Sequence, residues 1–327
     1  MMFWKKKRIG LALGGGGARG LAHIGVLRVL EREGISIDLI VGTSIGALVG
    51  GAYASGNSPD ELQRKVDAYL NSAEFQSSAM KAFEAAHAKG ELGLTQKIQT
   101  TLRNCFYLIQ AMFKPGILSN EDFQTTINYF IPDIQIEETR IPFRAVATDL
   151  VSGEQITFSH GPLRQAVMAS CAVPGAIAPL KEGEKLLSDG GIICLVPSSV
   201  ARQEGGDVVI SVAVDRCISS EELRNVVDVY YRVSEIMGEK LKNYELAEAD
   251  VVILTEVGDL HWSNFSQAMN LIDEGEKAAR EKLDDIRNVM PGLRKWFRFK
   301  KIPKRNTPPP ASIYEADRKF KGVALKP

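Results

Sequence analysis

Short apolar runs alternate with amphipathic stretches along most of the chain. Six apolar runs predict strands, at residues 9–13, 39–41, 143–148, 185–187, 208–214 and 251–254. Apolar positions at helical spacing predict helices at about 21–33, 44–55, 59–71, 161–170, 220–247 and 264–284. This alternation is typical of a mostly parallel sheet with helices on both faces. We therefore predict an α/β fold, a three-layer α/β/α sandwich around a mostly parallel central sheet.

Residues 72–140 interrupt this alternation, because they carry no strand signal between the second and third predicted strands. Apolar side chains recur there at helical spacing, at Ile98, Leu102, Phe106, Ile109 and Phe113. Pro115-Gly116 then ends the pattern. We predict a helical insertion that either packs on the core or forms a cap over a pocket.

Composition is that of a globular chain with a sizeable core. Of the 327 residues, 45% are hydrophobic, which is ordinary for a folded domain. The four cysteines are scattered without a C-x-x-C pair, at Cys105, Cys171, Cys194 and Cys217. We therefore expect a reducing compartment, with neither a disulfide framework nor a metal site.

Positive charge is concentrated at the two ends of a chain that is neutral overall. Residues 1–8 carry four positive charges and no negative ones, and residues 291–327 carry eleven positive and two negative. Because the whole chain is neutral, residues 9–290 must carry a net charge of −13. We predict three parts: a basic segment at 1–8, a central domain at 9–290 and a basic, proline-containing tail at 291–327.

Aromatic residues accompany the basic ends, with Phe3 and Trp4 at one and Trp296, Phe297 and Phe299 at the other. Such segments suit an anionic membrane surface, where each Lys or Arg contributes about 1 kcal/mol. A solvated tail explains the same residues. The apolar stretch 9–13 is too short for a signal peptide, and no run reaches the about 18 residues of a membrane span. We expect a cytoplasmic protein that contacts the inner face of the membrane peripherally and binds no nucleic acid.

Gly42-Thr43-Ser44-Ile45-Gly46 places a serine between a predicted strand and a predicted helix. The order is G-x-S-x-G, the pattern of a nucleophilic serine on a sharp turn. Glycine at both ends leaves room for the turn that lifts the serine oxygen clear of the backbone. An ordinary turn in which Ser44 caps the helix explains the same five residues, so context must decide.

A run of four glycines, followed by Ala18, Arg19 and Gly20, comes directly after the first predicted strand. Adjacent glycines let successive N–H groups point into one small space, an arrangement that binds negative charge. Gly15-x-Gly17-x-x-Gly20 also matches the dinucleotide-binding fingerprint, which expects an acidic residue at the end of the next strand. Asp38 precedes that strand, so a dinucleotide-binding enzyme is the less favoured alternative.

Ser188-Asp189-Gly190-Gly191 follows another predicted strand. Asp-Gly is a common turn signal, but a carboxylate here could also serve as the base for a serine nucleophile. A histidine base is less favoured. Only His261 follows Asp189, as the α/β-hydrolase order requires, and Ser44 has a single strand–helix unit before it.

Together, G-G-G-x-R-G, G-T-S-x-G and D-G-G resemble the patatin-like phospholipases, in a bacterial branch similar to neuropathy-target-esterase catalytic domains. The resemblance covers roughly residues 8–285 and includes the stretches 11–27, 147–150 and 169–174. It implies a Ser–Asp dyad that works without histidine, metal or cofactor, with Ser44 as nucleophile and Asp189 as base. It further implies an oxyanion hole at Gly15, Gly16 and Gly17, supported by Arg19, Gly42, Gly46, Gly190 and Gly191.

The activity that this resemblance implies is hydrolysis of fatty-acyl esters of lipids, by a phospholipase A, lysophospholipase or carboxylic ester hydrolase. A cap at residues 72–140 would then line an acyl-chain pocket. One position departs from the family pattern, because Cys194 stands where an asparagine is usual. A catalytically weak lipid-binding or regulatory protein therefore remains the alternative. The substrate head group, the chain length and the oligomeric state stay open.

Overall fold

The computed structural model describes residues 7–78, 80–81, 84, 116–118, 120–215, 223, 226–258, 260 and 263–290. The chain divides into two units, residues 1–291 and 292–327, and all of the described residues lie in the first. The predicted helix around Phe106, the whole of the predicted tail at 291–327 and most of the basic N-terminal segment lie outside the described residues.

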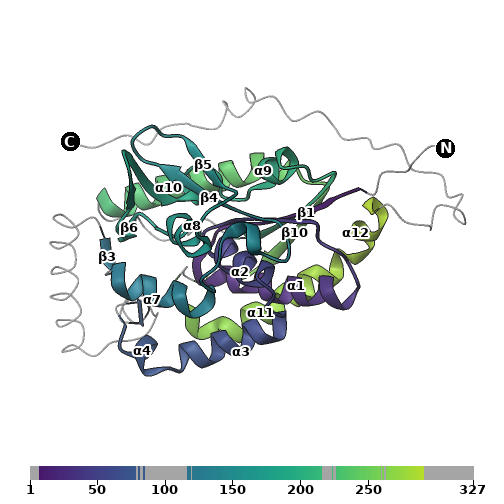
Figure 1. Ribbon diagram of the computed structural model, residues 1–327, viewed down its shortest axis with the longest axis horizontal. Coiled ribbons are helices and arrows are strands. Elements are labelled where there is room, and N and C mark those ends of the chain that lie inside the picture. The colour runs from purple at the N-terminus through teal and green to yellow at the C-terminus, as the bar shows by residue number, and fades with distance from the viewer. Residues whose placement is uncertain are drawn as a thin grey trace, which may run out of the picture. The chain divides into compact units, whose positions relative to one another are not determined.

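An eight-stranded sheet forms the centre of the first unit (Figure 1). Five strands run parallel in the order β10, β9, β1, β2, β4, with bounds Val251–Glu256, Val208–Asp215, Ile9–Leu13, Leu39–Thr43 and Phe143–Asp149. Antiparallel strands complete the sheet: β8 (Lys185–Asp189), β7 (Leu180–Glu182) and β5 (Gln155–Phe158). The mostly parallel α/β sandwich is thus confirmed, together with all six predicted strands.

A smaller sheet pairs β3 (Gly116–Leu118) with β6 (Gly175–Ile177). The expectation that residues 72–140 contain no strand is therefore wrong at β3. Three residues that pair only with an equally short partner carry too little apolar pattern to be detected in the sequence. The other described elements of this segment are helical, at α4 (Ala73–Gln76), α7 (Asn120–Phe130) and the short η2 (Ile136–Glu138).

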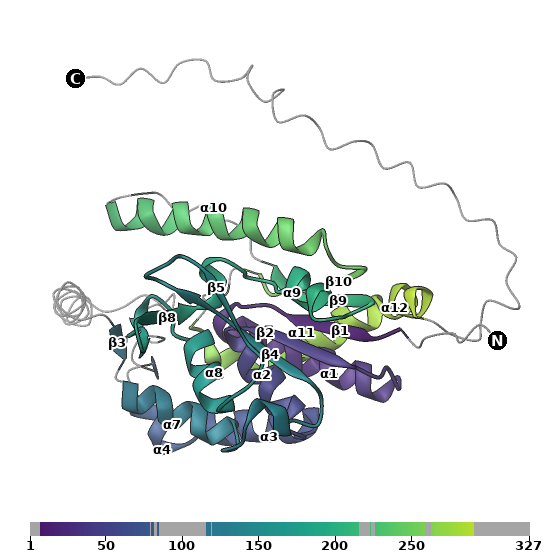
Figure 2. The same ribbon diagram turned by 45° about the horizontal axis from the view of Figure 1, so that its top comes forward.

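Helices cover both faces of the large sheet, with α9 and α10 on one side and α1, α2 and α3 on the other (Figure 2). Their bounds are α1 Ala22–Arg32, α2 Ile45–Ala54, α3 Pro59–Leu70, α8 Leu163–Ser170, α9 Ser198–Gln203, α10 Val226–Leu246, α11 Ala268–Glu281 and α12 Leu283–Val289. Short 3₁₀ turns are η1 (Gly17–Leu21), η3 (Gly190–Ile192) and η4 (Phe265–Gln267). The six helices predicted outside the 72–140 insertion are all present with shifted ends.

Side-chain alternation along the strands creates the two layers of core. Leu11 and Leu13 of β1 belong to the larger apolar cluster, which also contains residues of α1, α2 and α11. Ala12 between them points to the opposite face and packs in a second cluster with Val200 and Ala201 of α9. Because both faces are buried, most positions of the central strands are apolar. No described helix is both long enough and apolar enough to cross a bilayer.

Strand β4 determines where the carboxyl ends of two other strands meet. Along one edge it pairs with β5, so β2 and β8 must share the other edge. Thr43, at the end of β2, lies opposite Val146, and Asp189, at the end of β8, lies opposite Ala147. The two strands run toward each other and end at neighbouring positions of β4. The residues that follow them are therefore brought together.

Candidate active site

Ser44 occupies a strained turn directly after β2. Its φ of 55° makes it the one non-glycine residue with positive φ in the described part of the chain. Such a conformation costs on the order of 1–3 kcal/mol and persists only where the surroundings enforce it. Here the flanking glycines are enclosed by backbone. A Cβ at Gly42 would lie 2.5 Å from Ala47, and one at Gly46 would overlap the Leu13 carbonyl.

A second serine holds this turn in place. The N–H of Ser44 donates to Oγ of Ser170, at the end of α8, over 2.9 Å. The Ser170 hydroxyl in turn donates to the carbonyl of Val146 in β4 over 2.6 Å. Ser170 is fully buried, so the strained turn is fastened to the central sheet rather than to solvent.

The Ser44 hydroxyl donates a hydrogen bond to Oδ2 of Asp189, with 2.5 Å between the oxygens. The other carboxylate oxygen accepts the N–H of Gly191 over 2.7 Å, at the start of η3 beside Gly190. Thr148 of β4 donates its hydroxyl to the Asp189 carbonyl over 3.0 Å. Two side chains 145 positions apart are thus joined by a hydrogen bond at the carboxyl end of the sheet.

Burial raises the pKa of Asp189 to about 6, although the hydrogen bonds from Ser44 and Gly191 act in the opposite direction. Only 6% of the residue's surface is exposed, so its negative charge is poorly solvated. A carboxylate with a raised pKa is a better proton acceptor at neutral pH than an ordinary aspartate.

The glycine run lies beside this pair. The N–H of Gly15 donates to the carbonyl of Leu195 over 2.9 Å, which fastens the run to the chain after Asp189. Gly16 and Gly17 follow with φ values of 154° and 60°. Nε of Arg19 donates to the Gly16 carbonyl over 3.1 Å, so Arg19 lies against the loop.

His23 holds the other end of the glycine run. Its Nε2 donates to the carbonyl of Gly14 over 2.8 Å. Burial lowers the pKa of His23 to about 4, so the ring is neutral at physiological pH. A neutral imidazole that has no contact with Ser44 or Asp189 serves here as a fixed hydrogen-bond donor.

Cys194 takes part in the loop behind Asp189. Its N–H donates to the Gly190 carbonyl over 2.8 Å, and its own carbonyl accepts the Thr43 hydroxyl over 3.0 Å. The thiol is hydrogen-bonded to Glu245 of α10, and burial raises its pKa. The backbone hydrogen bonds that hold this loop would form with any residue at position 194. The Cys194 side chain additionally links the loop to α10.

Ser44 lies in the wall of an apolar cavity of about 440 Å³. Helices α2, α3, α4 and α7 supply much of the lining, including Leu48, Val66, Tyr69, Phe75, Ile127 and Phe130. Gly17 of the glycine run also borders it. The cavity is of a size that suits small organic ligands and offers mainly apolar contacts.

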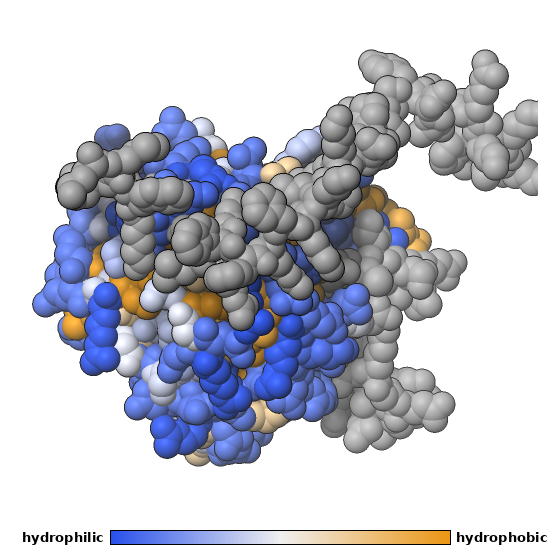
Figure 3. All heavy atoms as spheres, turned by 90° about the vertical axis from the view of Figure 1, so that its right-hand side faces the viewer, coloured by the Kyte–Doolittle hydropathy of each residue, from blue (hydrophilic) through white to orange (hydrophobic). Residues whose placement is uncertain are grey.

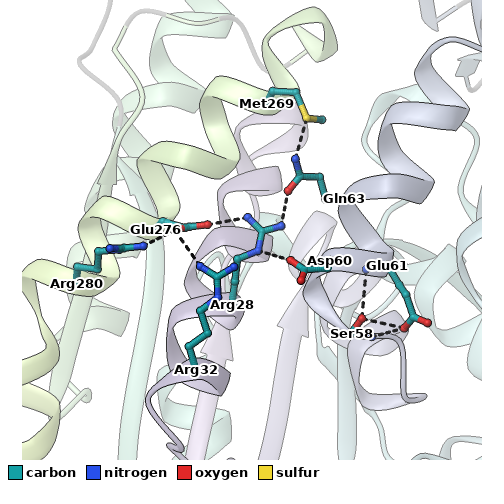
Figure 4. A network of polar contacts seen from close by, with 9 residues as sticks. All are labelled: Arg28, Arg32, Ser58, Asp60, Glu61, Gln63, Met269, Glu276 and Arg280. Carbon is teal, nitrogen blue, oxygen red and sulfur yellow. Dashed lines mark hydrogen bonds and ion pairs between the residues drawn. The ribbon is translucent and has the colours of Figure 1, made fainter.

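Arg28 of α1 fastens the α3 wall of this cavity to the core (Figure 4). Its guanidinium contacts Asp60 of α3 and Glu276 of α11, each over 2.7 Å, and also donates to Gln63 of α3. The Arg28 side chain is only 8% exposed. Removal of this buried cation would leave Glu276 without its main partner.

The family model for patatin-like phospholipases matches residues 11–200, more than half of the chain. The chain belongs to the patatin-like phospholipase family. The match includes the glycine run, Ser44 and Asp189.

Known proteins are similar to about two thirds of the chain. An uncharacterized NTE family protein from Mycobacterium bovis is 36% identical over 208 residues, 64% of this chain and 49% of that protein. Patatin-like phospholipase domain-containing proteins 7 of Rattus norvegicus and 6 of Homo sapiens are 35% and 34% identical over 63% of this chain. The chain spans about half the length of the mycobacterial relative and 13% of the two mammalian ones.

Solved structures with a similar arrangement include VipD from Legionella pneumophila, with a TM-score of 0.45 and 14% identity over 86% of this chain and 67% of VipD. Human GIVD cytosolic phospholipase A2, in complex with methyl gamma-linolenyl fluorophosphonate, has a TM-score of 0.42 and 11% identity. That match covers 86% of this chain and 59% of the human one.

Three residues of this patatin-like site were not assigned a role from the sequence. Ser170 and Thr148 fall in stretches that carry the family resemblance, but their partners belong to distant segments. His23 lies in the first such stretch, residues 11–27, where its position on a helix indicates a packed or capping residue rather than a base. The sequence signal for these three residues is that they lie in stretches that resemble the family. That signal does not predict which groups each side chain contacts.

The alternatives considered from the sequence gain no support from the geometry. Asp38, the acid of the dinucleotide fingerprint, lies before β2 and accepts the N–H of Ile9 at the amino edge of the sheet. His261 lies outside the described residues. Within the described ranges, no group of three or more His, Cys, Asp or Glu is placed to hold a metal ion.

Proposed function

We propose that this chain is a serine acyl hydrolase that cleaves fatty-acyl esters of phospholipids or related lipids. The observation that carries the proposal is the 2.5 Å hydrogen bond between Ser44 and Asp189 at the wall of a 440 Å³ apolar cavity. Membership of the patatin-like family supports a lipid substrate.

In the proposed reaction, Asp189 accepts the hydroxyl proton while Ser44 Oγ attacks the ester carbonyl. The tetrahedral intermediate collapses, and the alcohol leaves with the proton held by Asp189. Asp189 then takes a proton from water, whose oxygen attacks the acyl-enzyme, and the fatty acid is released as Ser44 recovers its hydrogen. No cofactor is required.

The oxyanion of the intermediate needs N–H donors that are not already used. Because Gly15 donates its N–H to Leu195, we assign the oxyanion hole to the N–H groups of Gly16 and Gly17. Gly17 borders the same cavity as Ser44, which supports the assignment. Arg19 and His23 would then position this loop through the carbonyls of Gly16 and Gly14. Loss of one such donor typically lowers kcat by about 100- to 1000-fold.

The apolar cavity is proposed to hold the acyl chain. Ala52 of α2 is 1% exposed and lines it, so Ala52→Leu would fill part of the space without adding charge. We expect turnover of a long-chain ester to fall about tenfold or more relative to a short-chain ester. Equal losses on both esters would argue against this use of the cavity. The sequence also predicts that a cap lines the acyl-chain pocket, but the part of it that contains Phe106 and Ile109 lies outside the described residues.

The pKa of Asp189 predicts the pH dependence of the reaction. The base must be ionised, so kcat/KM should rise as pH increases through about 6 and then level off. A profile that is flat from pH 5 to pH 8 would mean that another group limits the reaction.

Two substitutions test the assignment directly. Ser44→Ala and Asp189→Asn should each abolish turnover of a chromogenic fatty ester, while Ser55→Ala at the other end of α2 should leave it unchanged. A fluorophosphonate should label the unmodified protein but not Ser44→Ala. Retained turnover in either dyad variant would overturn the proposal. Lipid binding without turnover or labelling would instead favour the catalytically weak alternative.

We also propose that the basic, aromatic ends contribute a peripheral contact with anionic membranes. The support is the sequence alone, eleven positive and two negative residues at 291–327. Removal of residues 292–327, which form a separate unit, should weaken sedimentation with anionic vesicles, and added salt should weaken the binding of the full chain. Equal, salt-insensitive binding of both forms would refute this contact.

A further inference from the structure

Helix α10 turns apolar side chains toward solvent. Val226, Tyr230, Val233, Met237 and Tyr244 are spaced by three, four or seven residues, so they share one face of the helix. Four of them are 66–73% exposed, and Val233 is 45% exposed. In Figure 3 most of the described surface is hydrophilic, with smaller hydrophobic patches near the centre and at the edge of the view. We call these five residues the α10 stripe.

The inward face of the same helix is charged, the reverse of an ordinary surface helix. Lys242 is buried and contacts Glu239 over 2.9 Å, while Arg232 contacts Glu235 over 3.3 Å. Glu245 accepts a hydrogen bond from Ser199 of α9 over 3.0 Å and is also bonded to Cys194. The contacts of Glu245 with Ser199 and Cys194 join this face of the helix to the chain beneath it, so a rotation that buried the stripe would break them.

The same inward face borders a cavity of about 270 Å³ above the glycine run. Gly15, Gly16 and Gly191 line it from the sheet side, and Glu235, Glu239 and Lys242 line it from α10. The polar face is therefore directed inward, toward the loop beside the dyad, and the apolar face is left for an outside partner. Figure 2 shows α10 as the outermost of the described helices on the α9 side of the sheet.

We propose that the α10 stripe docks on a lipid membrane containing anionic headgroups. Among the exposed described side chains of α10, Lys240 is the one charged group, so the stripe face presents a cation and no carboxylate to an anionic surface. Tyr230 and Tyr244 are suited to the headgroup region, and Val233 and Met237 to the acyl chains below it. This surface does not depend on the proposed hydrolase activity.

A second copy of the chain is a less suitable occupant. The 21 residues of α10 span about 31 Å, and a helix is about 10 Å wide. Stripe against stripe would therefore bury roughly 600 Å² in total, well below the about 1,200 Å² of a stable specific interface. This minimum applies to an interface between two proteins and does not limit insertion of the stripe into a membrane.

The test uses the full chain and vesicles of phosphatidylcholine with or without phosphatidylglycerol. Val233→Glu/Met237→Glu should bind anionic vesicles about tenfold more weakly than the unmodified protein, because two apolar contacts become charged. Gln203→Glu/Asn270→Glu adds the same charge at exposed positions outside α10 and should bind normally. Val233→Leu/Met237→Leu keeps the stripe apolar and should also bind normally.

Thermal unfolding of each variant establishes that the changes are local. Equal vesicle binding by the Val233→Glu/Met237→Glu variant and the unmodified protein would overturn the proposal. So would a dimer, detected by light scattering, that this variant converts to a monomer without a change in vesicle binding, since the stripe would then be a self-association surface. Binding through the stripe should persist at salt concentrations that abolish binding through the basic ends.

Discussion

Replacement of Asp189 by asparagine is expected to make the protein more stable at neutral pH while it abolishes turnover. Burial raises the pKa of this carboxyl from its ordinary value of 3.8 to about 6. Because the folded-state pKa is the higher one, the unfolded chain loses the proton first. Stability therefore falls as pH rises from about 4 to about 6, by about 3 kcal/mol in all.

An amide does not ionise in this range, so the Asp189→Asn variant escapes that loss. The free energy of unfolding is measured by urea denaturation at about pH 4 and at about pH 7. The difference between the variant and the unmodified protein should grow by about 2 kcal/mol between these values, in favour of the variant at the higher pH.

Ser44→Ala is the matched control, because it should also abolish turnover under the proposed mechanism but keeps the carboxyl. It removes a hydrogen bond that lowers the pKa of Asp189, so its stability should continue to fall at higher pH than in the unmodified protein. A stability difference for Asp189→Asn that does not change with pH would refute the reasoning. Asp189 would then bind its proton equally in both states and have no unusual basicity.

Three other substitutions test how the site is held. Ser170→Ala leaves the N–H of Ser44 without its acceptor, so kcat should fall about tenfold or more and stability by about 1–3 kcal/mol; an unchanged kcat would contradict this role. His23→Phe removes the donor to the glycine run and should lower kcat, whereas His23→Gln, which keeps an N–H, should retain most of it; equal losses would argue against positioning by this hydrogen bond. Arg28→Met should cost about 2 kcal/mol of stability and so lower the melting temperature by about 4–8 °C. It should also raise KM more for long-chain than for short-chain esters. An unaltered ratio of the two KM values would mean that α3 does not contribute to substrate binding.

The central strands could be predicted because burial on both faces makes most of their positions apolar. In β9 (Val208–Asp215), Ser211 and Asp215 are the two polar residues. The strands that were missed lie at the edge or outside the large sheet. Gln155–Phe158 in β5 is half-buried along its length, and Leu180–Glu182 in β7 is short and largely exposed. Their pairing is determined by β4 and β8 rather than by a local pattern.

The positions of Ser44 and Asp189 follow from local motifs, but their contacts do not. The encounter of the two side chains depends on β2 and β8 sharing one edge of β4. These pairings join segments about 100 residues apart for β2 and β4, and about 40 apart for β4 and β8. The sequence likewise could not show that Leu195 already accepts the N–H of Gly15. That bond is why Gly16 and Gly17 are preferred as donors.

The head-to-head arrangement of β2 and β8 on β4 has a consequence for the order of biosynthesis. A nascent chain of about 150 residues contains the serine turn, the glycine run and β4, but it has no base. The carboxylate arrives only when the β7–β8 hairpin is translated and pairs with the free stretch of β4. Under the proposed mechanism, Ser44 therefore leaves the ribosome before its base and is inactive. Lipid cleavage begins only when the later β7–β8 hairpin completes the sheet.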